Sequence, residues 1–263
     1  MLLTLSASAS GRKDRQRDTT LYSDIYLDTV QVNKVFTLND YMLIGFEAGT
    51  GFNRMMLNPA YMQSWRRFPE HYEVTFTRYG KMFGYMPYFG FKIGAAYSHE
   101  GYRMKPNEKG FVGSISGATE AEYDVVEALF LTHLHYDLPH FKIIGDLGPY
   151  VGKRMNIERI GGNTPDLIRN EFLDWDRRFD YGFRAAAGFA IVLDPVEFHV
   201  TAKFRYGLQN LYDPDYESPY YYNYAYPRDL MITAGLHFQL SKKTGKTRSE
   251  LKKEAYDTVF GKD

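Results

Sequence analysis

The sequence predicts an all-β protein: a closed antiparallel up-and-down transmembrane β-barrel with eight strands, or ten as the alternative. Apolar and polar residues alternate with a period of two over runs of about 10–13 residues, where ordinary strands have about 5–6. Strands of about 9–11 tilted residues are what a bilayer requires. The connections between runs alternate between short and long. The 23 Tyr, 19 Phe and 23 Gly residues favour strands with tight bends over helices.

Charge and composition exclude several other classes of protein. The 32 Lys and Arg residues balance the 32 Asp and Glu residues, so the chain lacks the basic excess that suits a nucleic-acid partner. The 44% hydrophobic and 17% aromatic content excludes global disorder. Cysteine is absent, which removes disulfides, thiolate metal sites and a cysteine nucleophile. The longest nearly apolar run, Ala185–Leu193, is about half of the roughly 18 residues that a spanning helix needs.

The first residues resemble the end of a signal peptide. Ala7-Ser8-Ala9 is similar to a signal-peptidase site, but the basic start and the full apolar length of a signal are missing. We therefore expect a truncated signal remnant at 1–10 and a solvated periplasmic segment at 11–40. The barrel is predicted at 41–240, and a basic periplasmic tail at 241–263.

Eight strands follow from the alternation. The clearest is Glu197–Gln209, where every second residue from Phe198 to Leu208 is apolar and the residues between them are polar or Gly. The weakest is the second, because Gly80, Gly84 and Pro87 interrupt the sequence after it, and this leaves the ten-stranded alternative. The predicted strands are Met42–Gly51, Tyr72–Thr77, Phe89–Ser98, Val126–Tyr136, Phe141–Arg154, Tyr181–Leu193, Glu197–Gln209 and Asp229–Leu240.

The connections place the barrel in an outer membrane. Short connections are predicted around 80–84, 137–140 and 193–196, and long ones at about 53–71, 103–122, 156–180 and 210–228. In a meander all long loops then lie at one end, as in outer-membrane barrels, where they face outward and the short turns face the periplasm. An even strand number puts both termini on the periplasmic side. A secreted soluble lipid-binding β-barrel is the second alternative, because it also alternates.

The polar face of each strand is expected to point into the lumen, and the apolar face into lipid. Eight strands leave an interior just wide enough for side chains, so opposite charges inside should pair and plug it. The residues predicted to form this lumen charge network are Glu47, Lys92, Glu127, His133, His135, Lys142, Asp146, Arg184, Glu197, Lys203 and Arg205.

Two motifs suggest a family. Polar-x-Gly-x-x-aromatic-x-apolar in the last strand resembles the β-signal read by the outer-membrane barrel assembly machinery, and it comprises Thr233, Gly235, Phe238 and Leu240. Three stretches over about 41–240 resemble the PorT-like outer-membrane β-barrel family of Bacteroidota: Tyr123–Phe130, Gly148–Gly152 and Phe204–Asn210. The chain departs from the family pattern at Ala128 and at Phe141–Ile143. The resemblance implies the fold and the outer-membrane location, and its founding member is linked to type IX secretion.

The sequence predicts a non-enzymatic structural, accessory or interaction role, with no cofactor and no bound metal. His133 and His135 form a His-x-His pair that can chelate a metal with Glu127 or Asp146 nearby, but the spacing fixes no third ligand. Polar lumen filling is the favoured interpretation of that pair.

The alternative function is an enzyme or a metal-binding or ligand-binding barrel that uses histidines and carboxylates at its rim. His71, His99 and Glu100 lie near the predicted rims. No nucleophile elbow or spacing of paired catalytic carboxylates accompanies them.

The loops and the tail offer contact surfaces. Clustered aromatic residues predict an outer-loop contact surface, with an interfacial aromatic girdle as the alternative; they are Trp175, Tyr220, Tyr221, Tyr222 and Tyr224. Near-helical spacing over 165–179 suggests a short helix above the outer mouth. In the tail, Thr247 and Glu250 have capping-box spacing, which suggests a helix that docks a periplasmic protein. The other expected partners are the lipid bilayer, lipopolysaccharide and the assembly machinery.

Overall fold

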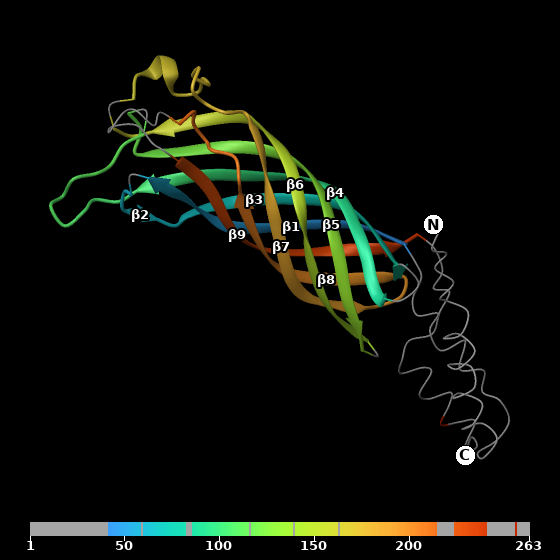
Figure 1. The fold of residues 1–263 in the computed structure, drawn as a ribbon. Helices are drawn as coiled ribbons and strands as arrows, with labels where there is room; N and C mark the ends of the chain where they lie inside the picture. Colours follow the sequence, from blue (N-terminus) through green and yellow to red (C-terminus); the bar gives the residue numbers. More distant parts are fainter. Residues whose placement is uncertain are drawn as a thin grey trace, which may run out of the picture.

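The computed structural model is a tilted, closed β-barrel (Figure 1), and it describes residues 42–58, 60–82, 86–115, 117–138, 140–162, 164–214, 224–240 and 256. Within these ranges eight long strands form the wall: β1 (Met42–Asn58), β3 (Arg66–Met82), β4 (Met86–Met104), β5 (Glu120–Asp137), β6 (Phe141–Ile160), β7 (Phe179–Val192), β8 (Val196–Gly207) and β9 (Tyr224–Gln239). The short strand β2 (Gln63–Ser64) pairs with the end of β4. No helix in the described part is long and apolar enough to cross a membrane.

Antiparallel pairing closes the ring. The order around the barrel is β1, β3, β4, β5, β6, β7, β8 and β9, and β9 pairs again with β1. Each long strand is therefore hydrogen-bonded on both sides and has no free edge. This confirms the predicted fold class, an antiparallel up-and-down transmembrane barrel.

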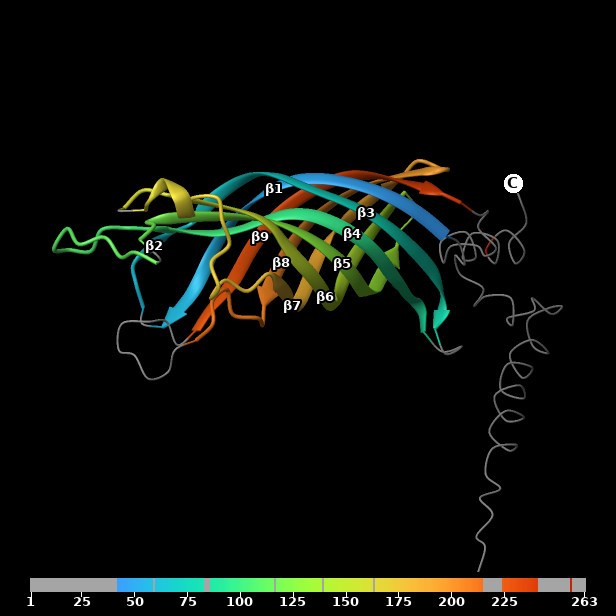
Figure 2. The same cartoon turned by 90° about the horizontal axis from the view of Figure 1, so that it is seen from above.

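The connections alternate in length as predicted. The chain passes from β3 to β4, from β5 to β6 and from β7 to β8 at one end, where the strands are separated by only three residues, and we call this the turn end. The longer connections from β1 to β3, β4 to β5, β6 to β7 and β8 to β9 start and finish at the other end, the loop end. A turn-end hairpin is closed by the Leu193 N–H, which donates to the Val196 carbonyl at 2.8 Å. Figure 2 shows the connections of the loop end gathered away from the turns. The first residue of β1 and the last of β9 both lie at the turn end.

The outward face of the barrel carries an apolar belt. The outward side chains of Phe130 and Ile232 are 60% and 62% exposed, while the inward side chain of Glu127 is 1% exposed. This is inverted relative to a soluble protein and matches a wall in contact with lipid. The belt includes Phe46, Val74, Ile93, Phe130, Leu134, Ile143, Leu147, Phe183, Leu230 and Ile232.

Beyond the belt the strands continue toward the loop end with the opposite polarity. In β5, Glu120, Glu122 and Asp124 point outward and Ala121, Tyr123 and Val125 are fully buried inside. The period of two is unbroken, but the apolar residues change face after Val125. The predicted strand Val126–Tyr136 begins at this change, which explains why the observed β5 is longer. The same extension shortens the long loops relative to the prediction.

The inward apolar residues at the loop end form a compact cluster, which we call the loop-end core. It contains Met55, Leu57, Tyr102, Met104, Ile115, Ala121, Tyr123, Val125, Ile157, Leu211, Tyr212 and Ala225. Of the helix suggested over 165–179, only a short 3₁₀ turn, η2 (Asp166–Ile168), is present in the described part. The segment is held instead by Arg159, whose Nη1 donates to the carbonyls of Ile168 and Glu171, each at 2.7 Å.

Candidate functional site

The predicted lumen residues lie inside the barrel and pair across it. Arg184 of β7 donates to Glu73 of β3 at 2.9 Å, and these strands are at opposite positions in the ring. Arg205 of β8 likewise contacts Glu100 of β4, again across the full diameter. All four side chains are at least 98% buried. Contacts of this kind occupy the middle of the lumen, which eight strands leave only wide enough for side chains.

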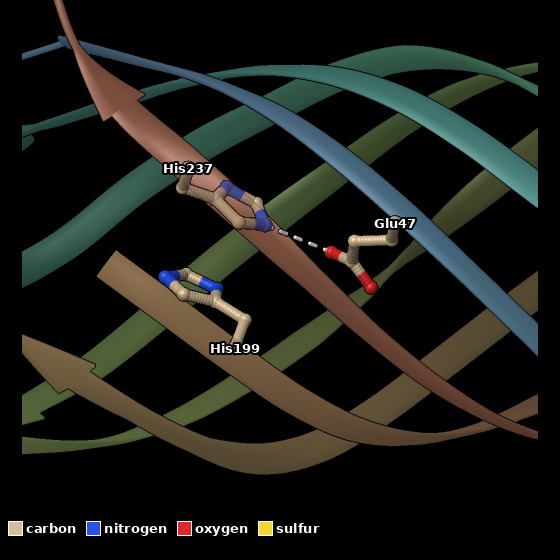
Figure 3. Close-up of side chains that lie close together, drawn as sticks. All are labelled: Glu47, His199 and His237. Carbon is tan, nitrogen blue, oxygen red and sulfur yellow. Dashed lines mark hydrogen bonds and ion pairs between the residues drawn. The ribbon is translucent and has the colours of Figure 1, made fainter. Parts of the chain in front are cut away.

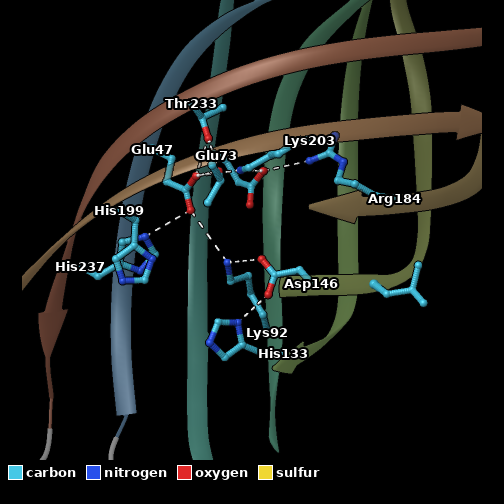
Figure 4. Close-up of polar contacts among 12 residues, drawn as sticks. Glu47, Glu73, Lys92, His133, Asp146, Arg184, His199, Lys203, Thr233 and His237 are labelled. Atoms are coloured by element: carbon cyan, nitrogen blue, oxygen red, sulfur yellow. Dashed lines mark hydrogen bonds and ion pairs between the residues drawn. The ribbon is translucent and has the colours of Figure 1, made fainter. Parts of the chain in front are cut away.

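The central layer is built around two buried carboxylates, Glu47 and Glu73 (Figure 4). Lys203 Nζ lies 2.8 Å from Glu47 and 2.8 Å from Glu73, so one ammonium joins both. Lys92 Nζ lies 2.7 Å from Asp146 and 3.9 Å from Glu47. The Thr233 hydroxyl donates to Glu47 at 2.7 Å. Each charge therefore has an opposite charge or a donor beside it, which buried ions require.

A second layer, nearer the loop end, is centred on Arg205. Its guanidinium contacts the carboxylates of Glu100, Glu127, Asp180 and Asp229 and lies 4.7 Å above the ring of Tyr150.

Arg154 shares two of these carboxylates. It donates to Glu100 at 2.6 Å and to Asp180 at 3.0 Å. Two cations and four carboxylates thus form one ion-paired unit, and its members depend on each other for compensation.

The predicted histidine pair does not act as one chelate. His133 Nδ1 lies 2.5 Å from Asp146, whereas His135 Nδ1 lies 3.2 Å from Asp137, and the two rings stack with centroids 5.8 Å apart. Glu127, the other expected partner, pairs with Arg184 and Arg205 instead.

A different pair of histidines meets near Glu47 (Figure 3). The rings of His199 and His237 stack with centroids 3.7 Å apart. His237 Nε2 lies 3.2 Å from Glu47, and His199 Nε2 lies 3.1 Å from Glu197. These two histidines and Glu47 could hold a metal ion by their spacing, and all three are buried. Gly45 makes room for this arrangement, since a Cβ there would lie 2.2 Å from the His237 ring.

The remaining predicted lumen residues have partners at the turn end. Lys142 Nζ donates to Glu197 at 2.5 Å and lies 4.6 Å above the ring of Tyr79. Sequence reasoning did not include several side chains that complete the network, although most fall on the polar face of a predicted strand: Glu73, Arg154, Asp180, His199, Asp229 and His237. Asp180 was missed because its strand was predicted to begin one residue later.

The residues expected at the rim separate into two environments. His71 and Glu100 are buried in the lumen, where His71 contacts Glu73 and Glu100 contacts Arg205. His99 instead contacts Glu122 and Asp124, two outward residues of β5 just beyond the apolar belt. We call His99, Glu122 and Asp124 the rim cluster. Glu122 was the last residue of the predicted loop 103–122, and Asp124 lay between that loop and the predicted strand Val126–Tyr136.

The β-signal residues lie on β9, with Leu240 directly after it. Thr233 and Gly235 face inward against Glu47, and Phe238 and Leu240 face outward with more than 40% of each exposed. Of the predicted outer-loop contact surface, Trp175 is 47% exposed and Tyr224 stacks on Tyr226 at 5.6 Å. Tyr220, Tyr221 and Tyr222 lie outside the described residues, as does the tail except for Tyr256.

Tyr212 is a titratable residue of the loop-end core, and it follows strand β8 instead of belonging to a strand of the wall. Its hydroxyl lies 2.9 Å from that of Tyr123 and donates to that of Tyr102 at 3.4 Å. Burial raises the pKa of Tyr212 well above its ordinary value, and the neighbouring Tyr123 adds to the shift.

Comparison with known proteins finds no family model and no curated protein that matches the sequence. Several solved outer-membrane β-barrels are similar in structure. OprG from Pseudomonas aeruginosa is 11% identical with a TM-score of 0.48, covering 78% of this chain and 98% of that one. The attachment invasion locus protein Ail of Yersinia pestis is 13% identical with a TM-score of 0.37, covering 75% and 99%.

One similarity corrects a prediction. The outer membrane protease OmpT from Escherichia coli is 13% identical with a TM-score of 0.32, covering 77% of this chain and 96% of that one. The expectation that the chain is not an enzyme is contradicted, because barrels among the similar structures include a protease. Neither the fold nor the absence of a catalytic motif decides the enzymatic activity of this chain.

Proposed function

We propose that the chain is an outer-membrane β-barrel with a sealed lumen, which holds its folded loop end on the outer side of the membrane. The belt of outward apolar side chains supports residence in a bilayer. The asymmetry between short turns and long loops supports the outer membrane and the outward direction of the loop end.

The observation that carries the sealed lumen is the pairing across the full diameter, by Arg184 with Glu73 and by Arg205 with Glu100. A continuous water path would have to break such pairs, and breaking a buried pair costs about 3–5 kcal/mol. The loop-end core adds an apolar closure above the charged layers.

Planar-bilayer recordings test the seal. We expect no steady conductance from the wild-type protein. The double variant Glu73→Ala with Arg184→Ala removes a cross-lumen pair and should produce intermittent current, which shows that the assay detects an opened lumen. Wild-type channels of reproducible conductance would contradict the proposal.

Single cysteines test the orientation, because the natural chain has none. Lys109→Cys places a thiol in the exposed loop between β4 and β5, and Leu138→Cys places one at the turn end. A membrane-impermeant maleimide should label the first on intact cells and the second only after the outer membrane is permeabilised. The reverse result would invert the proposed orientation.

The location in turn implies partners. Lipopolysaccharide would contact the belt in the outer leaflet, and the barrel assembly machinery would read Thr233–Leu240 during insertion. A periplasmic protein could dock on the tail at the turn end. The PorT-like resemblance implies a secretion role. Pull-downs that compare the wild type with a chain lacking 242–263 test whether a periplasmic protein binds the tail and whether a secretion component is recovered.

A further inference from the structure

The rim cluster brings one imidazole and two carboxylates to a point on the outer wall. Asp124 lies directly opposite His99 in the β4–β5 ladder, and Glu122 lies two residues along the same face of β5. His99 Nδ1 is 2.9 Å from Asp124 Oδ1 and 3.1 Å from Glu122 Oε1. The three ligand atoms lie within 4.8 Å of one another. Ligand atoms on a tetrahedral zinc ion, each at about 2.0–2.1 Å from it, are separated by roughly 3.3 Å.

These contacts do not behave as ordinary hydrogen bonds. Both oxygens lie within ion-pair distance of His99 Nδ1, but neither is aligned with the ring N–H, and the other ring nitrogen, Nε2, has no hydrogen-bond partner among the described residues. The His99 side chain is only 9% exposed. A metal ion bound to Nδ1 would lie along the direction of the nitrogen lone pair, and its other ligands would lie to the side of that direction. The two carboxylate oxygens lie beside Nδ1 in this way, so the three groups are arranged as metal ligands would be.

Each carboxylate is also held through its other oxygen. Asn156 Nδ2 donates to Asp124 Oδ2 at 2.9 Å, and Arg66 pairs with Glu122 Oε2. The oxygens Oδ1 and Oε1 are thereby left to face His99. Donors that orient the ligands from behind are a regular feature of metal sites.

The surroundings are open on one side and rich in negative charge. A pocket of about 470 Å³ borders Glu122, Asp124 and Asn156, and it also includes Glu158. Glu158 lies directly opposite Glu122 in the β5–β6 ladder, where like charges destabilise a sheet. A divalent cation would relieve this repulsion, and the pocket would supply water to its open position.

We propose that His99, Glu122 and Asp124 bind a divalent transition-metal ion of the Zn²⁺ class, with a fourth position open to the pocket. One imidazole with two carboxylates suits Zn²⁺ better than Ca²⁺ or Mg²⁺, which take oxygen ligands. The site lies just beyond Val126, where the apolar belt begins, so the ion is held at the level of the lipid headgroups.

The lumen histidines are the weaker candidate for this ion. Glu47, which would be their carboxylate ligand, already pairs with Lys203 at 2.8 Å and lies 3.9 Å from Lys92. A cation bound there would stand next to two ammonium groups. The rim cluster has a single cationic neighbour among its described ion pairs, Arg66, which contacts the Glu122 oxygen that faces away from His99.

Titration calorimetry with Zn²⁺ on the folded full chain in detergent tests the site. We expect one ion per chain, and His99→Gln should weaken binding by more than about 100-fold, since even the loss of an orienting residue costs 10–100-fold. Asn156→Ala should weaken it by about tenfold. His140→Gln is the matched control, because His140 is an exposed turn-end histidine far from the cluster, and it should leave binding unchanged.

A second measurement covers the case in which a variant fails to fold, as judged by heat-modifiable gel mobility. Asp124→Cys creates the only thiol, and Co²⁺ bound there should give the near-ultraviolet thiolate charge-transfer absorption, whereas His140→Cys should not. Absence of that absorption in folded Asp124→Cys overturns the proposal. So does Zn²⁺ binding that survives His99→Gln, or that disappears only in His199→Gln.

Discussion

The belt region and the loop end belong to one barrel, yet their polarity is opposite. In the belt region Phe130 faces outward and Glu127 inward, whereas at the loop end Glu122 faces outward and Tyr123 inward. The backbone is the same antiparallel ladder in both regions, since β5 pairs continuously with β4 from Glu120 to Leu134. The difference must therefore come from what surrounds the wall.

The two regions consequently hold together by different forces. In water, apolar side chains gain free energy by leaving the solvent, so the loop end packs them inside. In lipid no such gain exists, because the hydrocarbon is as apolar as the side chains. The belt region instead places ion pairs inside, where Arg205 and Lys203 connect strands that are not neighbours. The inward residues change from apolar Val125 to charged Glu127, and this change marks where water outside the wall is replaced by lipid.

The largest effect should come from removing the centre of the ion-paired interior. Arg205→Met leaves Asp229 without its described cation, while Arg154 and Arg184 still contact the other three carboxylates of the layer. An uncompensated buried charge costs about 3–5 kcal/mol. We expect the free energy of unfolding to fall by at least this amount, measured by urea denaturation in lipid vesicles.

Arg103→Met is the control for Arg205→Met. Arg103 pairs with Glu120 at the loop end at 2.8 Å, but its side chain is 52% exposed, so its loss should cost less than about 1 kcal/mol. Equal effects of the two substitutions would mean that ion pairs do not hold the belt region together.

A charge placed on one outward face should distinguish the two surroundings. Ile232→Lys puts an ammonium in the belt and should cost about 2–4 kcal/mol, whereas Tyr226→Lys on the same face of β9, beyond the belt, should cost about 0–1 kcal/mol. Unfolding equilibria of both variants in vesicles measure this. Similar costs at the two positions would mean that the membrane boundary does not lie between Tyr226 and Ile232, or that this face of β9 does not contact lipid.

The comparison also explains which parts of the fold could be predicted from the sequence. The strand around Phe198–Leu208 was identified because its alternation is regular throughout the membrane region. Strand β5 was predicted too short, because its apolar residues change face at Val125 and the outward Glu122 resembles a loop residue. An unbroken period of two with exchanged faces is the signal that would have found the extension.

For the interior, the sequence predicted which side chains point inward but not which ones meet. Arg184 and Glu73 are 111 residues apart and join opposite strands, so their contact depends on the stagger of the closed ring. The rim cluster was missed for the same reason as the extension of β5: His99 was placed at the rim, but both of its carboxylate partners fell outside the predicted strand Val126–Tyr136, and Glu122 fell in the predicted loop.

The smallest effect should come from one hydroxyl in the loop-end core, and it should depend on pH. Tyr212→Phe removes the contact with the Tyr123 hydroxyl at 2.9 Å and should cost about 1 kcal/mol near neutral pH. Because burial raises the pKa of Tyr212, the folded state keeps it neutral while the unfolded chain ionises near pH 10. The contribution of Tyr212 is thus complete below about pH 10 and declines above it, by up to about 1.4 kcal/mol per pH unit. The variant lacks this decline, so wild type and Tyr212→Phe should converge and then cross in stability between about pH 10 and 11 in urea titrations. A difference that stays constant with pH would mean that water reaches this hydroxyl and that the loop end has no dry core.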